Sequence, residues 1–305
     1  MEKKALITGA SGFVGNHLID ELADNDYDVF PTDVNGTLVD MDVINFKRVR
    51  EIIDQFRPDF IFHLAALAFV PTSWERPNLV FDVNLQGSVN LFEAVKSARI
   101  NPTIQIACSS EEYGEVHSDE APIKETNPLR PLSPYGVSKA AMDMLAYVYY
   151  KSYGMKIIRT RAFNHEGYGR GELYSTSDFC KQAVRIEKGL QEPIIKHGNL
   201  DSQRDFTDVR DMVRAYRLAV ELCEPGEVYN IGSGVKHTIK EVLETVRKFS
   251  KVKFNDEIDP NKLRPADVMV LLADARKFRE KTGWEPRYTL EDMINACLKY
   301  WRERL

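Results

Sequence analysis

The segment YGVSK places Tyr135 and Lys139 four positions apart within a stretch, residues 134–153, that has a helical pattern. At this spacing two side chains lie one above the other on the same helix face. We expect the fixed positive charge of Lys139 to lower the pKa of the Tyr135 phenol, so that the phenol exchanges protons near neutral pH. The pair therefore predicts a site where a tyrosine moves a proton while a hydride moves, and where the lysine also holds the ribose of a cofactor.

Ser109 follows a predicted core strand, residues 103–108, at its carboxyl end. In open α/β sheets these strand ends form the ligand crevice. A serine hydroxyl there can hydrogen-bond a substrate oxygen that alternates between ketone and alcohol. Ser110 and Glu111 follow directly. Glu111 has two interpretations: a solvated loop charge, or an acid–base group that lines the site.

Residues 8–15 have the sequence TGASGFVG and lie between the predicted first strand and first helix. Glycines at this place let the backbone turn tightly and approach a pyrophosphate, whose charge the helix N-terminus stabilises. The spacing is GxxGxxG and differs from the commoner GxGxxG, so a plain turn is the alternative, but the position after the first strand favours dinucleotide binding. The predicted cofactor contacts here are Gly9, Gly12, Phe13, Val14 and Gly15.

Asp33 ends the predicted second strand, where an acidic residue accepts hydrogen bonds from the adenosine ribose. A carboxylate there repels a 2′-phosphate, and no arginine or lysine stands beside Asp33 in the sequence to receive one. We therefore expect NAD(H) to be favoured, with NADP(H) as the other possibility. The alternative interpretation is a turn aspartate before Asn35-Gly36. Asp42 and Val43, a little further along, are predicted to frame the adenine.

Short apolar runs alternate with helical patterns through the first half of the chain. The runs predicted to be strands are residues 4–8, 27–32, 59–64, 103–108 and 156–161. One helical pattern follows the glycine turn and ends near residue 23, and three more cover residues 46–55, 83–98 and 134–153. Strands that alternate with helices specify a parallel sheet covered on both faces. The predicted fold is an α/β, Rossmann-type doubly wound sheet.

After Asn164 the alternation becomes less regular, with turn-rich segments at 167–171 and 192–203 and an expected irregular loop over 256–268. Residues 228–231 again have the pattern of a core strand. We therefore expect a dinucleotide-binding domain over 1–164 with a return segment at about 205–235. A smaller, interleaved substrate lobe is expected over 165–204 and 236–305.

The 305-residue chain has a formal charge of −5, with 43% hydrophobic and 29% charged residues. This composition is typical of a globular protein, and the acidic balance argues against binding to nucleic acid or an anionic membrane, which requires a basic face. The first residues show no signal-peptide pattern and no apolar stretch is long enough for a membrane span, so we expect a cytoplasmic location. The four cysteines are far apart and form no metal-ligand motif, so we expect no metal site.

A series of motifs follows in order along the chain: TGASGFVG, HLAA, SSEEYG, PYGVSK, RDFTDVRD, LRPADV and TGWEP. In this order and rough spacing they resemble the extended short-chain dehydrogenases/reductases that act on nucleotide sugars, over essentially the whole chain. The resemblance implies that Ser109, Tyr135 and Lys139 form the catalytic triad. It also implies that the residues flanking the bound cofactor include Leu64, Ala65 and Ala66.

The resemblance further implies a substrate-binding set. Asn84 resembles the asparagine that helps organise the active site of the family. Asn164, Arg204 and Arg264 match positions that hold the diphosphate and base side of the sugar nucleotide. Arginine suits that task because its rigid fork pairs with phosphate oxygens.

The segments SSEEYG, AFNHEG, GNLDSQRDFTDVRD and LRPADV look closest to the GDP-sugar branch, which includes GDP-mannose 4,6-dehydratases and GDP-4-keto-6-deoxymannose reductases. RDFTDVRD and the Ser-Ser-Glu order look more like the reductases, whereas FNHEG followed by GRGE looks more like the dehydratases. Tyr168 stands where both groups commonly carry proline. Asp33 departs from the basic, NADP-binding pattern usual in this branch.

Three enzymatic functions and one non-enzymatic alternative are considered. A reductase, the expected function, would deliver hydride from NAD(P)H to C4 of a GDP-4-keto-6-deoxyhexose while Tyr135 protonates the alkoxide. A 4,6-dehydratase would also need a base for the C5 proton and an acid for the departing hydroxyl, which Glu111 and Ser110 could supply. A 4-epimerase needs no such pair, and a non-enzymatic dinucleotide sensor would have little need of the triad.

The family's four-helix interface also implies a homodimer through residues 83–98 and 134–153.

Overall fold

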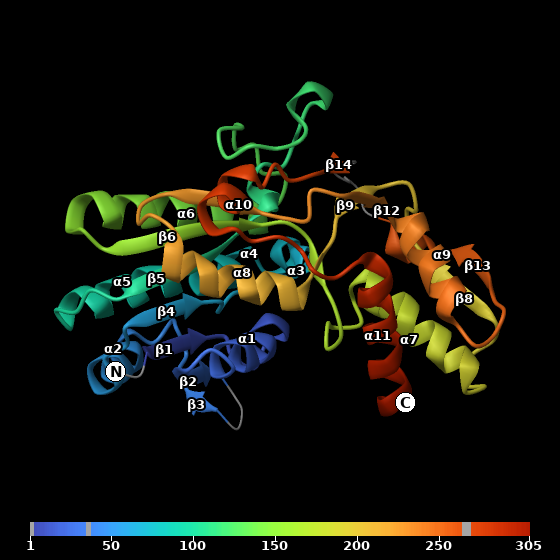
Figure 1. Ribbon diagram of the computed structural model, residues 1–305, viewed down its shortest axis with the longest axis horizontal. Coiled ribbons are helices and arrows are strands. Elements are labelled where there is room, and N and C mark those ends of the chain that lie inside the picture. The colour runs from blue at the N-terminus through green and yellow to red at the C-terminus, as the bar shows by residue number, and fades with distance from the viewer. Residues whose placement is uncertain (1–2, 35–37, 264–269) are drawn as a thin grey trace.

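A seven-stranded sheet forms the larger part of the molecule in the computed structural model, which describes residues 3–34, 38–263 and 270–305 (Figure 1). In spatial order its strands are β11 (Val228–Ile231), β6 (Lys156–Ala162), β5 (Thr103–Ser109), β4 (Phe60–His63), β1 (Lys3–Thr8), β2 (Tyr27–Asp33) and β3 (Val39–Asp40). Every neighbouring pair is parallel. The predicted doubly wound α/β fold is confirmed, and each predicted strand is present.

Helices cover both faces of this sheet. One face carries α1 (Phe13–Ala23), α8 (Val209–Leu222) and α10 (Arg276–Thr282). The other face carries α2 (Phe46–Phe56), α5 (Gly87–Ser97) and α6 (Pro134–Tyr153). Successive residues of β1 serve the two cores in turn, because side chains alternate across a strand: Ile7 packs with α1 and α8, and Leu6 with α2 and α5.

The strand order reverses between β1 and β4. From β1 the chain continues to β2 toward one edge of the sheet, and from β4 it continues to β5 toward the other edge. Ligands of open α/β sheets bind beyond the carboxyl ends of the strands at such a switch point. The short helices α3 (Val70–Glu75) and α4 (Pro77–Phe81) follow β4 there, and a π-helical turn, Asp82–Gln86, joins α4 to α5. The stretch expected as one helix over 83–98 is thus partly π-helical, a local irregularity that is common at functional sites.

The helix predicted to carry the reactive pair has well-defined ends. The Ser133 hydroxyl accepts a hydrogen bond from the backbone N–H of Gly136 (3.0 Å), and Pro134 fills the first helical position. Gly154 ends α6 in the left-handed conformation, with φ of 67°. These caps fix the first turn of α6, which places Tyr135 at the carboxyl edge of the sheet.

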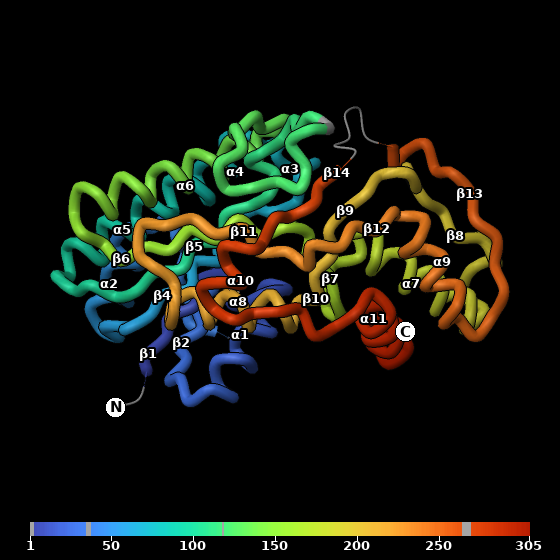
Figure 2. The backbone as a smooth tube through the Cα atoms, turned by 45° about the horizontal axis from the view of Figure 1, so that its top comes forward, coloured from blue at the N-terminus to red at the C-terminus, as the bar shows by residue number. Residues whose placement is uncertain are grey.

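A second group of elements lies at one end of the molecule (Figure 2). Its core is formed by α7 (Ser175–Glu187), α9 (Ile239–Phe249) and α11 (Leu290–Arg304). Short strands complete it: β7 (His165–Glu166) with β10 (Thr207–Asp208), β8 (Ile194–His197) with β13 (Asn255–Ile258), and β9 (Gln203–Asp205) with β12 (Lys236–Thr238) and β14 (Val270–Leu271). Isolated 3₁₀ turns occur at Ser110–Glu112, Ser118–Glu120 and Pro260–Lys262.

The expectation of an irregular loop over 256–268 was wrong for its first residues. Asn255–Ile258 pairs in parallel with Ile194–His197. All four residues of β13 are exposed and three are polar, so the sequence carries no alternating pattern to reveal this strand. It is held by backbone pairing with β8 and by contacts of the Asp256 carboxylate with Arg247 (2.6 Å) and His197 (3.3 Å). Within the described part of the chain, no helix combines the length and apolar character needed to cross a membrane.

Candidate functional site

Ser109, Tyr135 and Lys139 meet at the carboxyl end of β5. Ser109 is the last residue of the strand, and α6 brings Tyr135 and Lys139 against it. The close approach depends on Gly136, where a Cβ would lie only 2.6 Å from the carbonyl oxygen of Glu111. The glycine of the YGVSK segment therefore has a packing reason, and the structure brings together the three residues that the sequence proposed as a triad.

The Tyr135 phenol is 8% exposed, and burial raises its pKa. A hydrogen bond with the Ser109 hydroxyl lowers the pKa of Tyr135 again, while the negative charge of Glu111 raises it further. The expected net lowering by Lys139 is wrong for this structure, because desolvation outweighs the favourable contacts. Tyr135 is therefore a neutral phenol at neutral pH, poised to donate a proton.

Lys139 is buried as well, and burial lowers the pKa of its ammonium group. Its Nζ donates a hydrogen bond to the Ala107 carbonyl oxygen (2.7 Å) and lies 5.9 Å from the centre of the Tyr135 ring. One N–H bond is thus fixed by the strand, which orients the other two. Lys139 can use them for a ligand hydroxyl above the end of β5.

Glu111 and Ser110 lie in the 3₁₀ turn that follows Ser109. The backbone N–H of Glu111 donates to the Ser109 hydroxyl oxygen (3.2 Å), and the charge of its half-buried side chain acts on Tyr135. Ser110 is buried inside the turn, where its carbonyl accepts the N–H of Tyr113 (3.1 Å). The structure therefore places Glu111 toward the phenol and gives Ser110 a position within the turn.

Asn84 has no exposed surface, and its amide is used within the protein. Its Oδ1 accepts the N–H of Leu67 (2.8 Å), and its Nδ2 donates to the Ser138 hydroxyl (2.9 Å) and to the Leu67 carbonyl (3.3 Å). The Ser138 hydroxyl in turn donates to the Tyr135 carbonyl oxygen (2.7 Å). Asn84 thus joins the segment after β4 to the first turns of α6, and its amide atoms are hydrogen-bonded within the protein.

A hydrogen-bonded chain links Asn84 to the glycine turn through His63, a residue that the motif HLAA contained but that was not singled out. The Ser88 hydroxyl donates to the Asn84 carbonyl (2.6 Å) and so accepts from His63 Nε2 (3.0 Å). His63 Nδ1 then accepts from Thr8 Oγ1 (2.8 Å), which accepts the Ala65 N–H (3.1 Å). Burial, with a contribution from Lys139, lowers the pKa of His63 to about 3. The ring therefore stays neutral, with Nε2 as the hydrogen-bond donor and Nδ1 as the acceptor.

The glycine turn approaches the end of β4 closely. Gly9 has φ of +71°, and a Cβ there would lie 2.7 Å from the backbone nitrogen of Ala65. Gly12 caps α1 without a side-chain hydrogen bond from the described residues, so backbone N–H groups of the first turn face the crevice. The residues present therefore fit a dinucleotide pyrophosphate at this helix end. Leu64, Ala65 and Ala66 follow β4 directly and border the same turn.

Asp33 holds the glycine turn to the end of β2. Its Oδ2 accepts both the backbone N–H (2.9 Å) and the hydroxyl (2.6 Å) of Ser11, and its Oδ1 accepts the Val34 N–H (2.7 Å). Both carboxylate oxygens of Asp33 thus have partners within the protein, at the end of β2 beside the glycine turn. Asp42 Oδ1 accepts the Ile44 N–H (3.0 Å), and Val43 is buried against α5, where its side chain touches Gly87.

The Phe13 ring joins the glycine turn to the segment that enters the second group of elements. It stacks on His165, with 6.4 Å between ring centres, and the Arg170 guanidinium lies 4.9 Å from its centre. Nearby, His17 Nε2 donates to the Tyr168 carbonyl (2.9 Å), and the two rings meet edge to face. Tyr168, where the family commonly has proline, thus docks on α1. Val14 packs against the core that lies between the sheet and helices α1, α8 and α10.

Two further members of the expected substrate set, Asn164 and Arg204, lie in the described part of the chain. Asn164 lies at the end of β6, and its Oδ1 is buried without a hydrogen-bond partner among the described residues. Its carbonyl accepts the Thr207 N–H (2.9 Å), which brings the chain after β9 back beside it. Arg204 in β9 is buried and donates to the Gln203 carbonyl (3.0 Å). Arg264 lies outside the described residues.

The crevice therefore combines a neutral phenol, a serine hydroxyl and a lysine with a turn that fits a dinucleotide, an arrangement suited to hydride transfer at a carbonyl. Comparisons with known proteins agree with this chemistry. Residues 6–297 match the family described as GDP-mannose 4,6 dehydratase. A GDP-6-deoxy-D-mannose reductase of Pseudomonas aeruginosa is 30% identical, with 100% of this chain and 99% of the relative aligned.

A GDP-mannose 4,6-dehydratase of Vibrio cholerae is also 30% identical, with 96% of this chain and 92% of the relative aligned. Among solved structures, the enzyme named RMD from P. aeruginosa in complex with NADPH superposes with a TM-score of 0.92 at 29% identity, covering 99% of this chain and 100% of the other. The UDP-glucose 4-epimerase of Thermus thermophilus in complex with NAD gives a TM-score of 0.87 at 29% identity, with the same two coverages.

Proposed function

Because the chain belongs to the GDP-mannose 4,6-dehydratase family, we propose that it reduces the C4 ketone of a GDP-4-keto-6-deoxyhexose. The observation that carries this choice is the hydrogen-bonded pair of Ser109 and a neutral Tyr135, whose pKa is raised by burial. A phenol that keeps its proton is matched to protonating an alkoxide, the proton step of a ketone reduction.

The lengths of the alignments support the reductase over the dehydratase. The alignment with the P. aeruginosa reductase runs over 307 positions, nearly the 305 residues of this chain. The alignment with the V. cholerae dehydratase runs over 346 positions, so it includes stretches that have no counterpart here. The chain thus has the dimensions of the reductase.

In the proposed reaction a bound nicotinamide dinucleotide supplies the hydride. Ser109 donates a hydrogen bond to the ketone oxygen, and Tyr135 transfers its proton to that oxygen as the alcohol forms. Lys139 orients the cofactor ribose and stabilises the phenolate that remains. Gly9, Gly12 and Gly15 let the pyrophosphate approach the start of α1, since side chains there would fill the turn.

A second candidate is the 4,6-dehydratase. The position of Glu111 favours it, because this carboxylate lies close enough to Tyr135 to raise the pKa of the phenol. Removal of a C5 proton would need such a base. In that reaction the hydride returns to the substrate, and the cofactor shows no net change.

The test is to incubate the protein with GDP-4-keto-6-deoxymannose and NADH or NADPH, and separately with GDP-mannose alone. The proposal expects one cofactor molecule to be oxidised for each ketone reduced, with no turnover of GDP-mannose. Conversion of GDP-mannose without net cofactor oxidation would instead support the dehydratase. Turnover of neither sugar nucleotide would contradict both.

The choice between NADH and NADPH is expected to depend on Asp33. Two unit charges about 4 Å apart interact by roughly 4 kcal/mol at an effective dielectric of 20, and even a quarter of that gives about a fivefold preference for NADH. Because Asp33 also holds Ser11 and Val34, the informative variant is Asp33→Asn, which keeps an acceptor and removes the charge. Fluorescence titration should show a smaller difference between the affinities for NADH and NADPH in this variant. Equal affinities for the two cofactors in the unmutated protein would contradict the assignment of Asp33 to the adenosine ribose.

We also propose a homodimer that forms through α6. Of the apolar residues on this helix, Met142 and Tyr149 pack into the chain's own core, but Met144 is 58% and Val148 50% exposed. A Val148→Asp variant should therefore shift the light-scattering mass from twice 34.9 kDa to the single-chain value. Leu190→Asp, on an exposed leucine just after α7, is the control and should leave the mass unchanged. A single-chain mass for the unmutated protein at micromolar concentration would contradict the proposal.

A further inference from the structure

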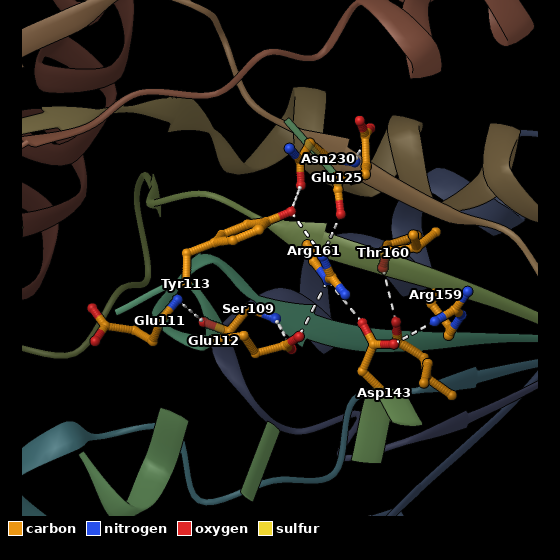
Figure 3. Close-up of polar contacts among 12 residues, drawn as sticks. Ser109, Glu111, Glu112, Tyr113, Glu125, Asp143, Arg159, Thr160, Arg161 and Asn230 are labelled. Atoms are coloured by element: carbon orange, nitrogen blue, oxygen red, sulfur yellow. Dashed lines mark hydrogen bonds and ion pairs between the residues drawn. The ribbon is translucent and has the colours of Figure 1, made fainter. Parts of the chain in front are cut away.

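Two carboxyl groups lie buried together behind Ser109 (Figure 3). The side chain of Glu112 is 0% exposed and that of Asp143 is 1% exposed. Asp143 accepts one hydrogen bond from Arg161 Nε (2.8 Å) and another from Arg159 Nη1 (2.6 Å). Glu112 Oε1 accepts the backbone N–H of Ser109 (2.9 Å). The cluster therefore joins the catalytic serine to α6, the helix that carries Asp143.

One oxygen of this cluster lacks a hydrogen bond. Glu112 Oε2 is buried and has no hydrogen-bond partner among the described residues. Arg161 Nε lies 3.2 Å from it, but the N–H of that atom is directed to Asp143. The ligand atoms of Glu112 and Asp143 lie within 4.8 Å of each other, so a proton on Glu112 would turn two facing acceptors into a donor and an acceptor. A buried acceptor left without a donor is costly, and protonation removes that cost.

We propose that Glu112 is a positioning residue that works as an un-ionised carboxylic acid. It donates its proton to Asp143 and accepts the Ser109 N–H, and so fixes the Ser109 hydroxyl relative to Tyr135 and Lys139 on α6. The inference rests on the proposed function, since the hydrogen bonds from Ser109 through Glu112 to Asp143 connect the proposed catalytic serine to the helix that carries Tyr135 and Lys139.

The surroundings of Glu112 favour the neutral acid. Burial, followed by the negative charge of Asp143, raises the pKa of Glu112 to about 8, against the opposing effect of Arg161. The titratable groups that face it come from three elements and the turn itself: Cys108 on β5, Tyr135, Lys139 and Asp143 on α6, Arg159 and Arg161 on β6, and Tyr113. Asp143 takes hydrogen bonds from both arginines, which leaves Glu112 as the carboxyl group that keeps its proton.

Hydrogen bonds of Arg161 and Tyr113 also fix the turn after β5 to neighbouring segments. Arg161 Nη1 donates to the Tyr113 hydroxyl (3.0 Å) and to the Glu125 carbonyl (3.1 Å), and Tyr113 donates to Asn230 Oδ1 (2.7 Å) (Figure 3). The side chains around Glu112 are therefore fixed, and a change of charge at Glu112 cannot be relieved by solvent. We expect the loss of the proton at high pH to act on Ser109 and Lys139 directly.

The test compares Glu112→Gln with Glu112→Met. Glutamine has the shape and hydrogen-bonding pattern of the neutral acid, since its oxygen can accept the Ser109 N–H and its amide can donate to Asp143. We expect Glu112→Gln to keep kcat within about twofold at pH 7, and Glu112→Met to lower kcat about tenfold with the KM for the sugar nucleotide unchanged. Glu115→Gln, on an exposed glutamate after the same turn, is the matched control and should behave as the unmutated protein.

The pH dependence gives a second readout. An acid whose pKa is raised in the folded state makes the protein lose stability as the pH rises from the unfolded-state pKa, about 4.3, toward the folded-state value of about 8. As the pH rises from 5 to 8, the midpoint of thermal unfolding of Glu112→Gln should therefore increase relative to that of the unmutated protein. We also expect the kcat of the unmutated protein to fall above about pH 8, where Glu112 loses its proton, and this fall should be absent from Glu112→Gln.

Infrared spectroscopy at pH 7 provides a readout without substrate. The difference between the spectra of the unmutated protein and Glu112→Gln should show the band of an un-ionised buried carboxyl group, because the contribution of Glu166, whose pKa burial raises to about 7, is the same in both proteins and cancels. If the band is missing, or if Glu112→Gln loses as much activity and stability as Glu112→Met, then Glu112 acts as an anion paired with Arg161 and the proposal is overturned. An unmutated protein that shows the band but reduces no ketone would overturn the proposed function alone.

Discussion

Replacing Tyr135 with phenylalanine is expected to lower kcat by about 10²–10⁴-fold while the affinity for the dinucleotide changes little. The substitution removes one hydroxyl group, which is the proton donor of the site and the hydrogen-bond partner of Ser109. The ring itself, 8% exposed, stays packed in the first turn of α6. The protein should therefore fold and bind cofactor, yet leave the ketone without an acid.

The measurement is single-turnover oxidation of reduced cofactor in the presence of GDP-4-keto-6-deoxymannose. Tyr147→Phe, which removes a half-exposed hydroxyl from the same helix, serves as the control and should retain full activity. More than roughly a tenth of the unmutated rate in Tyr135→Phe would contradict a proton-transfer role. A large loss of cofactor affinity in that variant would show instead that the hydroxyl holds the cofactor.

The sequence predicted the contact among Ser109, Tyr135 and Lys139 because that contact depends on the general geometry of parallel sheets. A residue that ends a central strand and a pair on the first two turns of the next long helix share one edge of the sheet. The sign of the pKa shift on Tyr135 was not predictable in the same way. It depends on how much water the completed fold removes from the phenol, and no local pattern reports that quantity.

The role of Glu112 was also hidden from the sequence. Two consecutive glutamates in SSEEYG suggest solvated charges, and the partners that bury the second one, Asp143 and Arg161, lie on α6 and β6. Strand β13 was missed for a related reason, because its residues are exposed and mostly polar and its partner strand β8 is a distant segment of the chain. Periodicity reveals elements that bury one face, whereas polar clusters and exposed strands depend on contacts between distant segments.

Replacing Gly15 with alanine is expected to weaken dinucleotide binding by roughly 10–100-fold, the equivalent of about one hydrogen bond to a charged group. A Cβ at Gly15 would lie 2.5 Å from the carbonyl oxygen of Ala10 and 2.6 Å from that of Gly9. Both atoms belong to the backbone of the turn, so no side-chain rotation can relieve the contact. The turn must move away from α1, and the N–H groups that face a pyrophosphate move with it.

Two effects oppose each other in this variant, and their sizes decide the outcome. Alanine in place of glycine within a helix gains about 0.5–1 kcal/mol from helix propensity, whereas forcing extra volume into a packed site costs about 1–3 kcal/mol. The clash is with backbone, so the cost should lie toward the upper end, and the midpoint of thermal unfolding should fall. Gly171→Ala is the control, because a Cβ there would meet no atom of the described residues within 4 Å, its chain neighbours aside. Calorimetric titration with NADH and NADPH measures the affinity; binding by Gly15→Ala within about threefold of the Gly171→Ala control would mean that the pyrophosphate does not lie on this turn.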